Sequence, residues 1–182
     1  MAAARTTYLL VDGENIDATL GTSVLGRRPQ PEERPRWQRL LEHAEDRWDQ
    51  DVKALFFLAV NDELPLGFVQ ALIAMGYTPV PLSGPGKVVD IAIDRTARAL
   101  VRRPADVLLV SHDSDFAPAM TELADGHRRL GVVGFTEFMA GDLRAIPGIE
   151  LLDLEHEVGA FTSRLPRVRI IPIDEFDPAE FI

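Results

Sequence analysis

Cysteine is absent from this chain of 182 residues. The absence excludes disulfide bonds and thiolate metal sites, and it favours a reducing cytoplasm as the location of the protein. The sequence also lacks any run of roughly 18 apolar residues, and its N-terminus shows no charged segment followed by an apolar one. We therefore expect a protein that is neither exported nor inserted into a membrane.

Positive charge is scarce as well. The sequence has 19 Lys and Arg residues against 29 Asp and Glu residues, a net charge of −10, and its only lysines are Lys53 and Lys87. This balance argues against a protein that coats duplex nucleic acid through bulk electrostatics. It remains compatible with a local acidic metal site, because such a site would itself contribute part of the excess negative charge.

What the sequence does have is a regular alternation of short apolar runs and segments with helical spacing. This alternation predicts an α/β fold, with a mainly parallel sheet covered by helices on both faces. Residues 16–35 are rich in Gly, Pro and Arg, and they are predicted as a loop with at most a short helical turn. The predicted strands are 7–11, 52–60, 77–82 (an edge strand), 106–111, 131–135 and 149–154, and the predicted helices are 36–48, 65–75, 88–103, 116–130 and 136–145.

Residues 1–154 are therefore expected to form one domain, because the alternation fades after residue 155. Residues 155–182 form a C-terminal extension. Its segment 168–173 (VRIIPI) is compatible with one extra strand, and an acidic tail follows it.

Acidic residues follow the apolar runs at three places. Asp12 follows the first strand, Asp113 and Asp115 follow the strand at 106–111, and Asp90 falls in the first turn of the longest helix. In an open parallel sheet, ligands bind beyond the carboxyl ends of the strands, so these acids are expected to meet at one edge. Carboxylates this close repel one another, and a hard divalent ion such as Mg²⁺ or Mn²⁺ removes the conflict. Four acids allow one or two ions.

Each acid also has a purely structural interpretation. Asp12 fits a turn before Gly13, Asp113 and Asp115 fit helix N-caps, and Asp94 is placed to pair with Arg98 on one helix face. Taken singly, each of these interpretations is the better one, but the three segments together favour the metal site. Asn15 and Ser111 are candidate supporting residues, and His112 is expected to be an exposed turn residue.

Three segments carry a family resemblance: LLVDGENI at 9–16, GKVVDIAIDRTARAL at 86–100 and LLVSHDSDFAPAMTEL at 108–123. Their order and spacing resemble the NYN domain of the PIN-like nuclease superfamily, which includes LabA-like proteins. The resemblance extends from about residue 7 to about residue 154. It implies a PIN-like three-layer α/β/α sandwich and a metal-dependent ribonuclease. The positions that match the family pattern are Asp12, Asn15, Asp90, Ser111, Asp113, Ser114, Asp115 and Phe116, with Asp94 matching a less central acid.

One departure from the family pattern is His112, which stands where the family usually has glycine. If that position requires a positive φ, a histidine there carries backbone strain.

The leading functional expectation is cleavage of RNA by metal-activated water, with Asp12, Asp90, Asp113 and Asp115 binding Mg²⁺ or Mn²⁺. Lys87, Arg27 and Arg28 are the candidate substrate-binding residues, and the family analogy allows a homodimer. One alternative is a non-catalytic domain of the same fold that binds RNA or a protein. Another is a topoisomerase-primase type of site, which would use Glu14 with Asp113 and Asp115 and would not need Asp90. A dinucleotide site is disfavoured because no G-x-G-x-x-G follows the first strand.

Overall fold

The apolar runs form a parallel sheet. The computed structural model describes residues 4–167 and 170–182, and over these residues six strands pair into one sheet in which every neighbouring pair is parallel. Each strand reaches the next through a segment that crosses back over the sheet, as parallel pairing requires. The strand order is β3-β2-β1-β4-β5-β6. The strands are β1 (Thr6–Asp12), β2 (Val52–Ala59), β3 (Thr78–Leu82), β4 (Ala105–Val110), β5 (Leu130–Gly134) and β6 (Ile149–Asp153).

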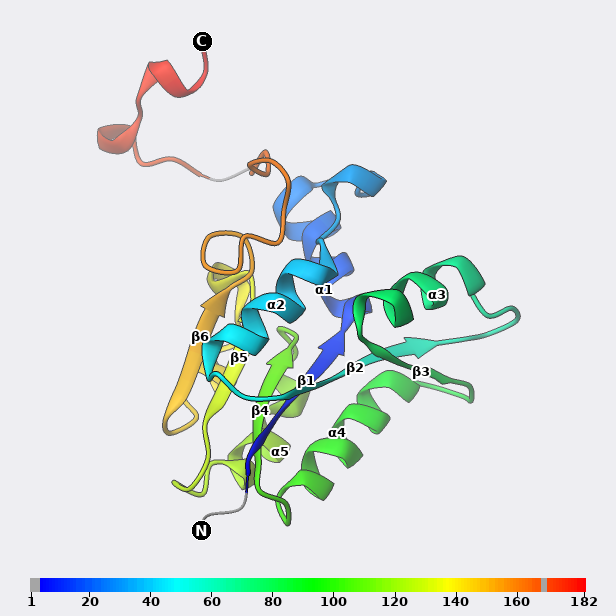
Figure 1. Ribbon diagram of the computed structural model, residues 1–182. Coiled ribbons are helices and arrows are strands. Elements are labelled where there is room, and N and C mark those ends of the chain that lie inside the picture. Colours follow the sequence, from blue (N-terminus) through cyan, green and yellow to red (C-terminus); the bar gives the residue numbers. More distant parts are fainter. Residues whose placement is uncertain (1–3, 168–169) are drawn as a thin grey trace.

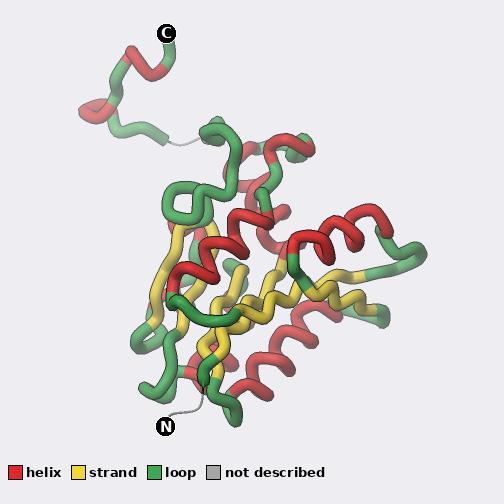
Figure 2. Tube along the Cα trace, in the orientation of Figure 1, coloured by secondary structure: helices red, strands yellow, loops and turns green. Residues whose placement is uncertain are grey.

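Helices cover both faces of the sheet, so the protein has the three-layer α/β/α architecture that the sequence predicted (Figure 1). Figure 2 shows the strands, in yellow, lying between helices in red. Leu9 and Val11 point into one core, under α1, α2 and α3, whereas Leu10 points into the other, under α4, α5 and α6. The helices are α1 (Gly13–Thr19), α2 (Trp37–Arg47), α3 (Leu66–Met75), α4 (Val88–Leu100), α5 (Ala117–Leu123) and α6 (Gly141–Arg144).

The backbone confirms the predicted edge strand. β3, which carries Pro79 and Pro81, is an edge strand, where missing N–H donors are tolerated. Gly76 ends α3 with a left-handed conformation at φ 108°, which glycine adopts without the steric cost of a Cβ. In the part of the chain that the structure describes, no helix combines the length and the apolar character needed to cross a membrane.

The prediction of a loop at residues 16–35 is wrong for its first half. α1 begins directly after β1 and continues as a π-helical segment, Leu20–Leu25, which ends at Gly26 with φ 70°. Ile16, Leu20 and Val24 are buried against the sheet, and their spacing of four residues is helical. Burial of this stripe outweighs the low helix propensity of the Gly, Thr and Ser residues between its members.

Three predicted helices are shorter than expected. The helix predicted at 116–130 ends at Leu123, because the chain turns through Gly126 at φ 77° to reach β5. The helix predicted at 88–103 ends at Leu100, ahead of Pro104, because the residue before a proline disfavours the helical conformation. The segment 136–145 forms a 3₁₀ turn, Thr136–Phe138, and then the short α6.

The C-terminal extension divides into two parts. Val158, Ala160, Phe161 and Leu165 are buried in the core beside α2, so this part packs on the sheet domain. The extra strand predicted at 168–173 is not found at residues 170–173; residues 168 and 169 lie outside the described residues. Figure 1 shows residues 170–182, in red, at a distance from the sheet.

Candidate metal centre

The strand register brings the ends of β1 and β4 together. Val11 pairs with Val110, so Asp12 and Ser111 follow at the same edge of the sheet. The Ser111 hydroxyl donates a hydrogen bond to Asp12 Oδ2 (3.1 Å) and accepts one from the backbone N–H of Asp113 (3.2 Å). One hydroxyl therefore ties the acid that ends β1 to the acidic turn after β4.

Asp12 is a buried carboxylate, 3% exposed. It accepts hydrogen bonds from the Ser111 hydroxyl and from the backbone N–H of Asn15 (3.4 Å), and the second of these caps α1. Burial raises the pKa of Asp12 to about 6, and the negative charges of Asp90 and Glu14 add to the shift, whereas the two hydrogen bonds oppose it. At neutral pH the folded chain therefore holds an anion that it solvates poorly, which a cation would stabilise.

Asp90, Asp113 and Asp115 form an acidic triad. Each offers one carboxylate oxygen, and the three oxygens lie within 4.8 Å of one another. Ligands on opposite sides of a Mg²⁺ ion lie about 4.2 Å apart, so a small inward movement would let all three hold one ion. Burial, followed by the charge of Asp113, raises the pKa of Asp90. The donor set is all oxygen, which suits Mg²⁺ or Mn²⁺.

A hollow of about 360 Å³ connects the triad to the first strand. Asp12, Glu14, Asp90 and Asp113 all line it. The structure thus brings the four expected acids to one edge, with the triad toward solvent and Asp12 more deeply buried. The individual ligand roles stay predictions.

Lys87 lies beside the triad. Its ammonium is 3.9 Å from Asp90 Oδ2 and 3.7 Å from Asp115 Oδ2, and its side chain is 74% exposed. The lysine offsets part of the negative charge of the triad, and it lowers the pKa of Asp90 against the upward effects of burial and Asp113.

His112 is buried, contrary to the expectation of an exposed turn residue. Asn15 Oδ1 accepts a hydrogen bond from the backbone N–H of His112 (2.8 Å) and lies 2.9 Å from Nδ1, while Nε2 accepts one from the N–H of Phe135 (2.8 Å). A neutral ring with its proton on Nδ1 satisfies all three contacts. Burial lowers the pKa of His112 to about 4, which keeps this form at neutral pH.

The histidine at this position carries no backbone strain. Among the described residues, Asp49 is the only non-glycine residue with positive φ, so the turn at His112 does not need glycine. Space for the ring comes from Gly134 instead, where an added Cβ would lie 2.5 Å from His112 Nε2. The Asn15 side-chain oxygen is committed to His112, so this residue stabilises the acidic turn.

Asp94, Arg27 and Arg28 lie neither in the lining of the hollow nor in the triad. Asp94 pairs with Arg98 at 2.9 Å, as the structural interpretation of the sequence anticipated. Arg27 pairs with Glu33 at 2.6 Å, and Arg28 is exposed on the loop after the π-helical segment. A substrate-binding role for the two arginines stays a prediction.

Glu14 is a residue that the leading sequence interpretation did not include. It lies in the first turn of α1, two residues after Asp12, and its side chain lines the hollow while its Oε1 accepts the N–H of Ala59 (3.3 Å). The available signal was an acid at the start of a segment with helical spacing, but that segment was predicted as a loop.

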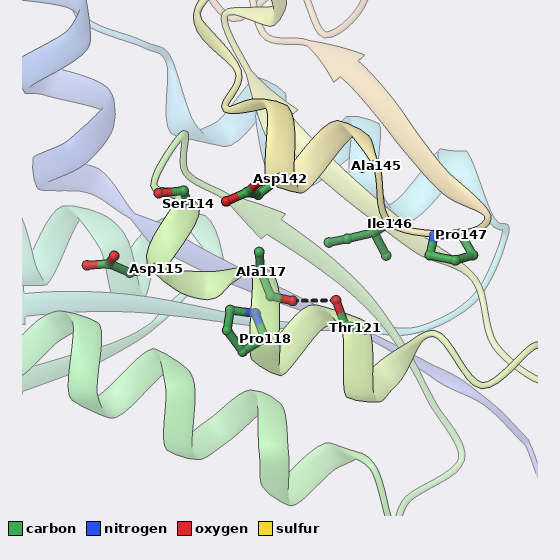
Figure 3. A pocket seen from close by; sticks show the side chains of 9 residues that line it. All are labelled: Ser114, Asp115, Ala117, Pro118, Thr121, Asp142, Ala145, Ile146 and Pro147. Carbon is green, nitrogen blue, oxygen red and sulfur yellow. Dashed lines mark hydrogen bonds between the residues drawn. The ribbon is translucent and has the colours of Figure 1, made fainter.

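A second, larger hollow of about 750 Å³ lies on the other side of Asp115 (Figure 3). The start of α5 and the segment through α6 line it, and Figure 3 shows the Asp115 carboxylate pointing away from α6. The hollow meets the triad only through Asp115. It offers space beside the acids and adds Asp142, but none of the described residues that line it is basic.

Comparison with known proteins identifies the family. The family model of the NYN domain matches residues 6–148. A crystal structure of a protein of unknown function from Vibrio parahaemolyticus superposes with a TM-score of 0.67 at 17% sequence identity, covering 86% of this chain and 98% of that chain. At this identity the likeness shows a common fold. No curated protein matches the chain.

Proposed function

This chain belongs to the NYN domain family, within the PIN-like nuclease superfamily, and we propose that it is a divalent-metal-dependent ribonuclease. The observation that carries the proposal is the crowding of Asp90, Asp113 and Asp115 within 4.8 Å, beside a buried Asp12 whose pKa is raised to about 6. Carboxylates in this arrangement are costly for the folded protein unless a cation joins them.

The side chains divide the work by position. Asp90, Asp113 and Asp115 would hold a divalent ion, and the buried Asp12, which lines the hollow with Asp90 and Asp113, would support it. A bound Mg²⁺ or Mn²⁺ ion supplies an activated water and neutralises the charge that develops on the phosphodiester. Ser111 fixes Asp12 relative to the turn at Asp113, and Lys87 meets a phosphate oxygen of the substrate.

RNA is the proposed substrate because NYN nucleases act on RNA. The metal is needed for binding as well as chemistry, since the acidic edge of a chain with a net charge of −10 repels phosphates. A cytoplasmic location and a homodimer are the remaining parts of this proposal.

The test is metal-dependent cleavage of a labelled single-stranded RNA, measured with Mn²⁺, with Mg²⁺ and with EDTA. We expect Asp90→Asn and Asp113→Asn each to lower the cleavage rate at least ~100-fold, because each removes an anionic ligand. Asp94→Asn is the matched control, since it changes the same residue type one turn along α4 and affects only the pair with Arg98. Equal losses from Asp90→Asn and Asp94→Asn would contradict the proposed ligand set.

Two other functions give different results in the same assay. A topoisomerase-primase type of site requires Glu14 and tolerates Asp90→Asn. A non-catalytic RNA-binding domain binds the RNA but leaves it intact with every metal. The position of the Lys87 ammonium between Asp90 and Asp115 favours this second alternative over the first, because it places a cation at the triad without any metal.

A further inference from the structure

An aromatic hollow lies next to the acidic edge. It has a volume of about 220 Å³, smaller than the ~300 Å³ and more of typical pockets for drug-sized ligands, and therefore suits a single ring system. The Phe56 ring lies 5.1 Å from Trp37 and 5.4 Å from Phe68, both nearly perpendicular to it. The residues that line the hollow and bear on its use are Gly13, Glu14, Arg34, Trp37, Phe56 and Phe68.

This hollow adjoins the acidic one. Glu14 lines both, so a strand that leaves the triad along α1 passes from one hollow to the next at this side chain. On its far side, Arg34, Trp37 and Phe68 also line a groove of about 580 Å³ along α2, which includes Arg36 and Arg39. One path thus runs from carboxylates, past aromatic rings, to arginines.

The charge of the side chains along the path changes from negative to positive with distance from the triad. Phosphates are repelled at the acids unless a cation is bound, whereas the groove along α2 offers three arginines. Arg34 Nε is buried and lies 3.5 Å from Asp17 Oδ1, an ion pair that among the described residues makes no hydrogen bond, whereas the Arg34 side chain as a whole is partly exposed. A partly exposed guanidinium beside aromatic rings is a suitable donor for a base or phosphate oxygen.

The shape of the hollow depends on the packing of Gly13. A Cβ at Gly13 would lie 2.6 Å from the Phe56 ring, so only glycine lets this ring reach its position beside the start of α1. Phe68 is 37% exposed on α3 and leaves one side of the hollow accessible from solvent. Packing thus holds Phe56, which is 2% exposed, whereas Trp37 and Phe68 are the rings that solvent reaches.

We propose that the aromatic hollow binds one unpaired base of a single-stranded RNA, next to the phosphodiester at the acidic edge. The inference rests on the proposed function and specifies its substrate class. Stacking on aromatic side chains accepts any base, and the arginines follow the backbone of the strand. A base in a duplex cannot enter the hollow, so the protein selects single strands over duplexes.

The test compares binding of two oligoribonucleotides by fluorescence anisotropy, with Ca²⁺ in place of Mn²⁺. One is an intact single strand, and the other has the same length and charge but carries abasic sugars throughout. Phe68→Ala removes one ring of the hollow. Ile73→Ala is the matched control, because it truncates an exposed apolar residue of the same helix that does not line the hollow.

We expect Phe68→Ala to weaken binding of the intact RNA roughly 10-fold, the effect of one lost stacking contact, and to leave abasic binding unchanged. Ile73→Ala should leave both unchanged. Equal effects of Phe68→Ala on the two RNAs, or equal effects of the two substitutions, would overturn the proposal. In the second case the apolar face of α3 acts as a whole, as it would in binding a protein.

Cleavage measured separately with Mn²⁺ distinguishes the two proposals. If the wild-type protein cleaves RNA but Phe68→Ala does not change RNA binding, the nuclease proposal stands and the base-binding proposal fails. If RNA binding depends on the bases but no cleavage occurs, the base-binding proposal stands and the nuclease proposal fails.

Discussion

Two buried aspartates on neighbouring strands, Asp12 at the carboxyl end of β1 and Asp106 at the amino end of β4, have opposite environments. Asp106 is 0% exposed, yet it accepts hydrogen bonds from Arg5 Nε (3.0 Å), Gln50 Nε2 (2.9 Å) and the backbone N–H of Arg129 (2.8 Å). Burial alone would raise its pKa, but these contacts outweigh burial and lower it. Asp12 has two weaker donors, and burial raises its pKa to about 6.

The comparison separates a structural carboxylate from one kept available for a ligand. Among the described residues no arginine or lysine pairs with Asp12, and the charges that shift its pKa, those of Asp90 and Glu14, are negative. The protein therefore stabilises the Asp106 anion at the amino edge of the sheet and leaves the Asp12 anion unstable at the carboxyl edge. Such an imbalance at one site is a common feature of functional positions.

The largest expected effect follows from removing the fully hydrogen-bonded aspartate, Asp106. Asp106→Ala leaves Gln50 and the Arg129 N–H without their acceptor and Arg5 without its counter-ion. We expect a loss of about 3 kcal/mol in the free energy of unfolding, measured by urea denaturation. Asp94→Ala, which breaks an exposed pair with Arg98, is the control and should cost less than about 1 kcal/mol. Similar losses from the two would mean that burial does not strengthen the Asp106 contacts.

The opposite substitution should stabilise the protein. Asp12→Asn keeps the acceptor for Ser111 and removes a buried charge, so without metal at pH 7 the free energy of unfolding should rise by about 2–3 kcal/mol. The same variant should lose its thermal stabilisation by Mn²⁺. Differential scanning fluorimetry with and without Mn²⁺ measures both, and a metal-free variant less stable than wild type would contradict the interpretation of Asp12.

The gain from Asp12→Asn should depend on pH. Because the folded pKa of Asp12 is about 6, above the 3.8 of an ordinary aspartate, the native state binds more protons between these two values and wild-type stability falls as pH rises through this range. The difference between variant and wild type should thus be near zero at pH 3.8 and complete above pH 6.

His112 acts in the opposite direction. Its folded pKa of about 4 lies below the 6.5 of an ordinary histidine, so it contributes stability that is present above pH 6.5 and is lost as pH falls toward 4. Because the two effects oppose each other, the stability of the wild type should change little between pH 4 and 6.5. The stability of Asp12→Asn should rise over the same range. Urea denaturation at half-unit pH steps measures both curves; parallel curves would rule out a titrating Asp12.

The smallest effect concerns Lys87. Lys87→Met removes a positive charge 3.7–3.9 Å from the triad, so we expect Mn²⁺ to bind about 5-fold more tightly in calorimetric titrations. RNA cleavage should have a higher KM, because the phosphate contact is lost. Unchanged Mn²⁺ affinity would place the lysine outside the influence of the triad, and Lys53→Met, on β2 and outside the acidic hollow, is the control.

Much of the fold was predictable because strong local signals agreed with the tertiary structure. β4 is buried along its whole length, and its apolar run at 107–110 favours a strand with helices on both faces. The segment at 16–25 was mispredicted because its apolar residues are separated by weak helix formers, and only the sheet beneath them makes the helix favourable. His112 was mispredicted because its partners, Asn15 and Phe135, come from distant parts of the chain.

The sequence by itself determined which side chains could meet, since short buried strands followed by Asp12, Asp113 and Asp115 place acids at one edge of any parallel sheet. Only the tertiary structure decided which carboxylates are satisfied. Asp106 and Asp12 both adjoin apolar runs, and the difference lies in whether Arg5 or another acid approaches in space. A pKa depends on burial and on the charges a few ångströms away, and neither is encoded in the neighbouring residues of the chain.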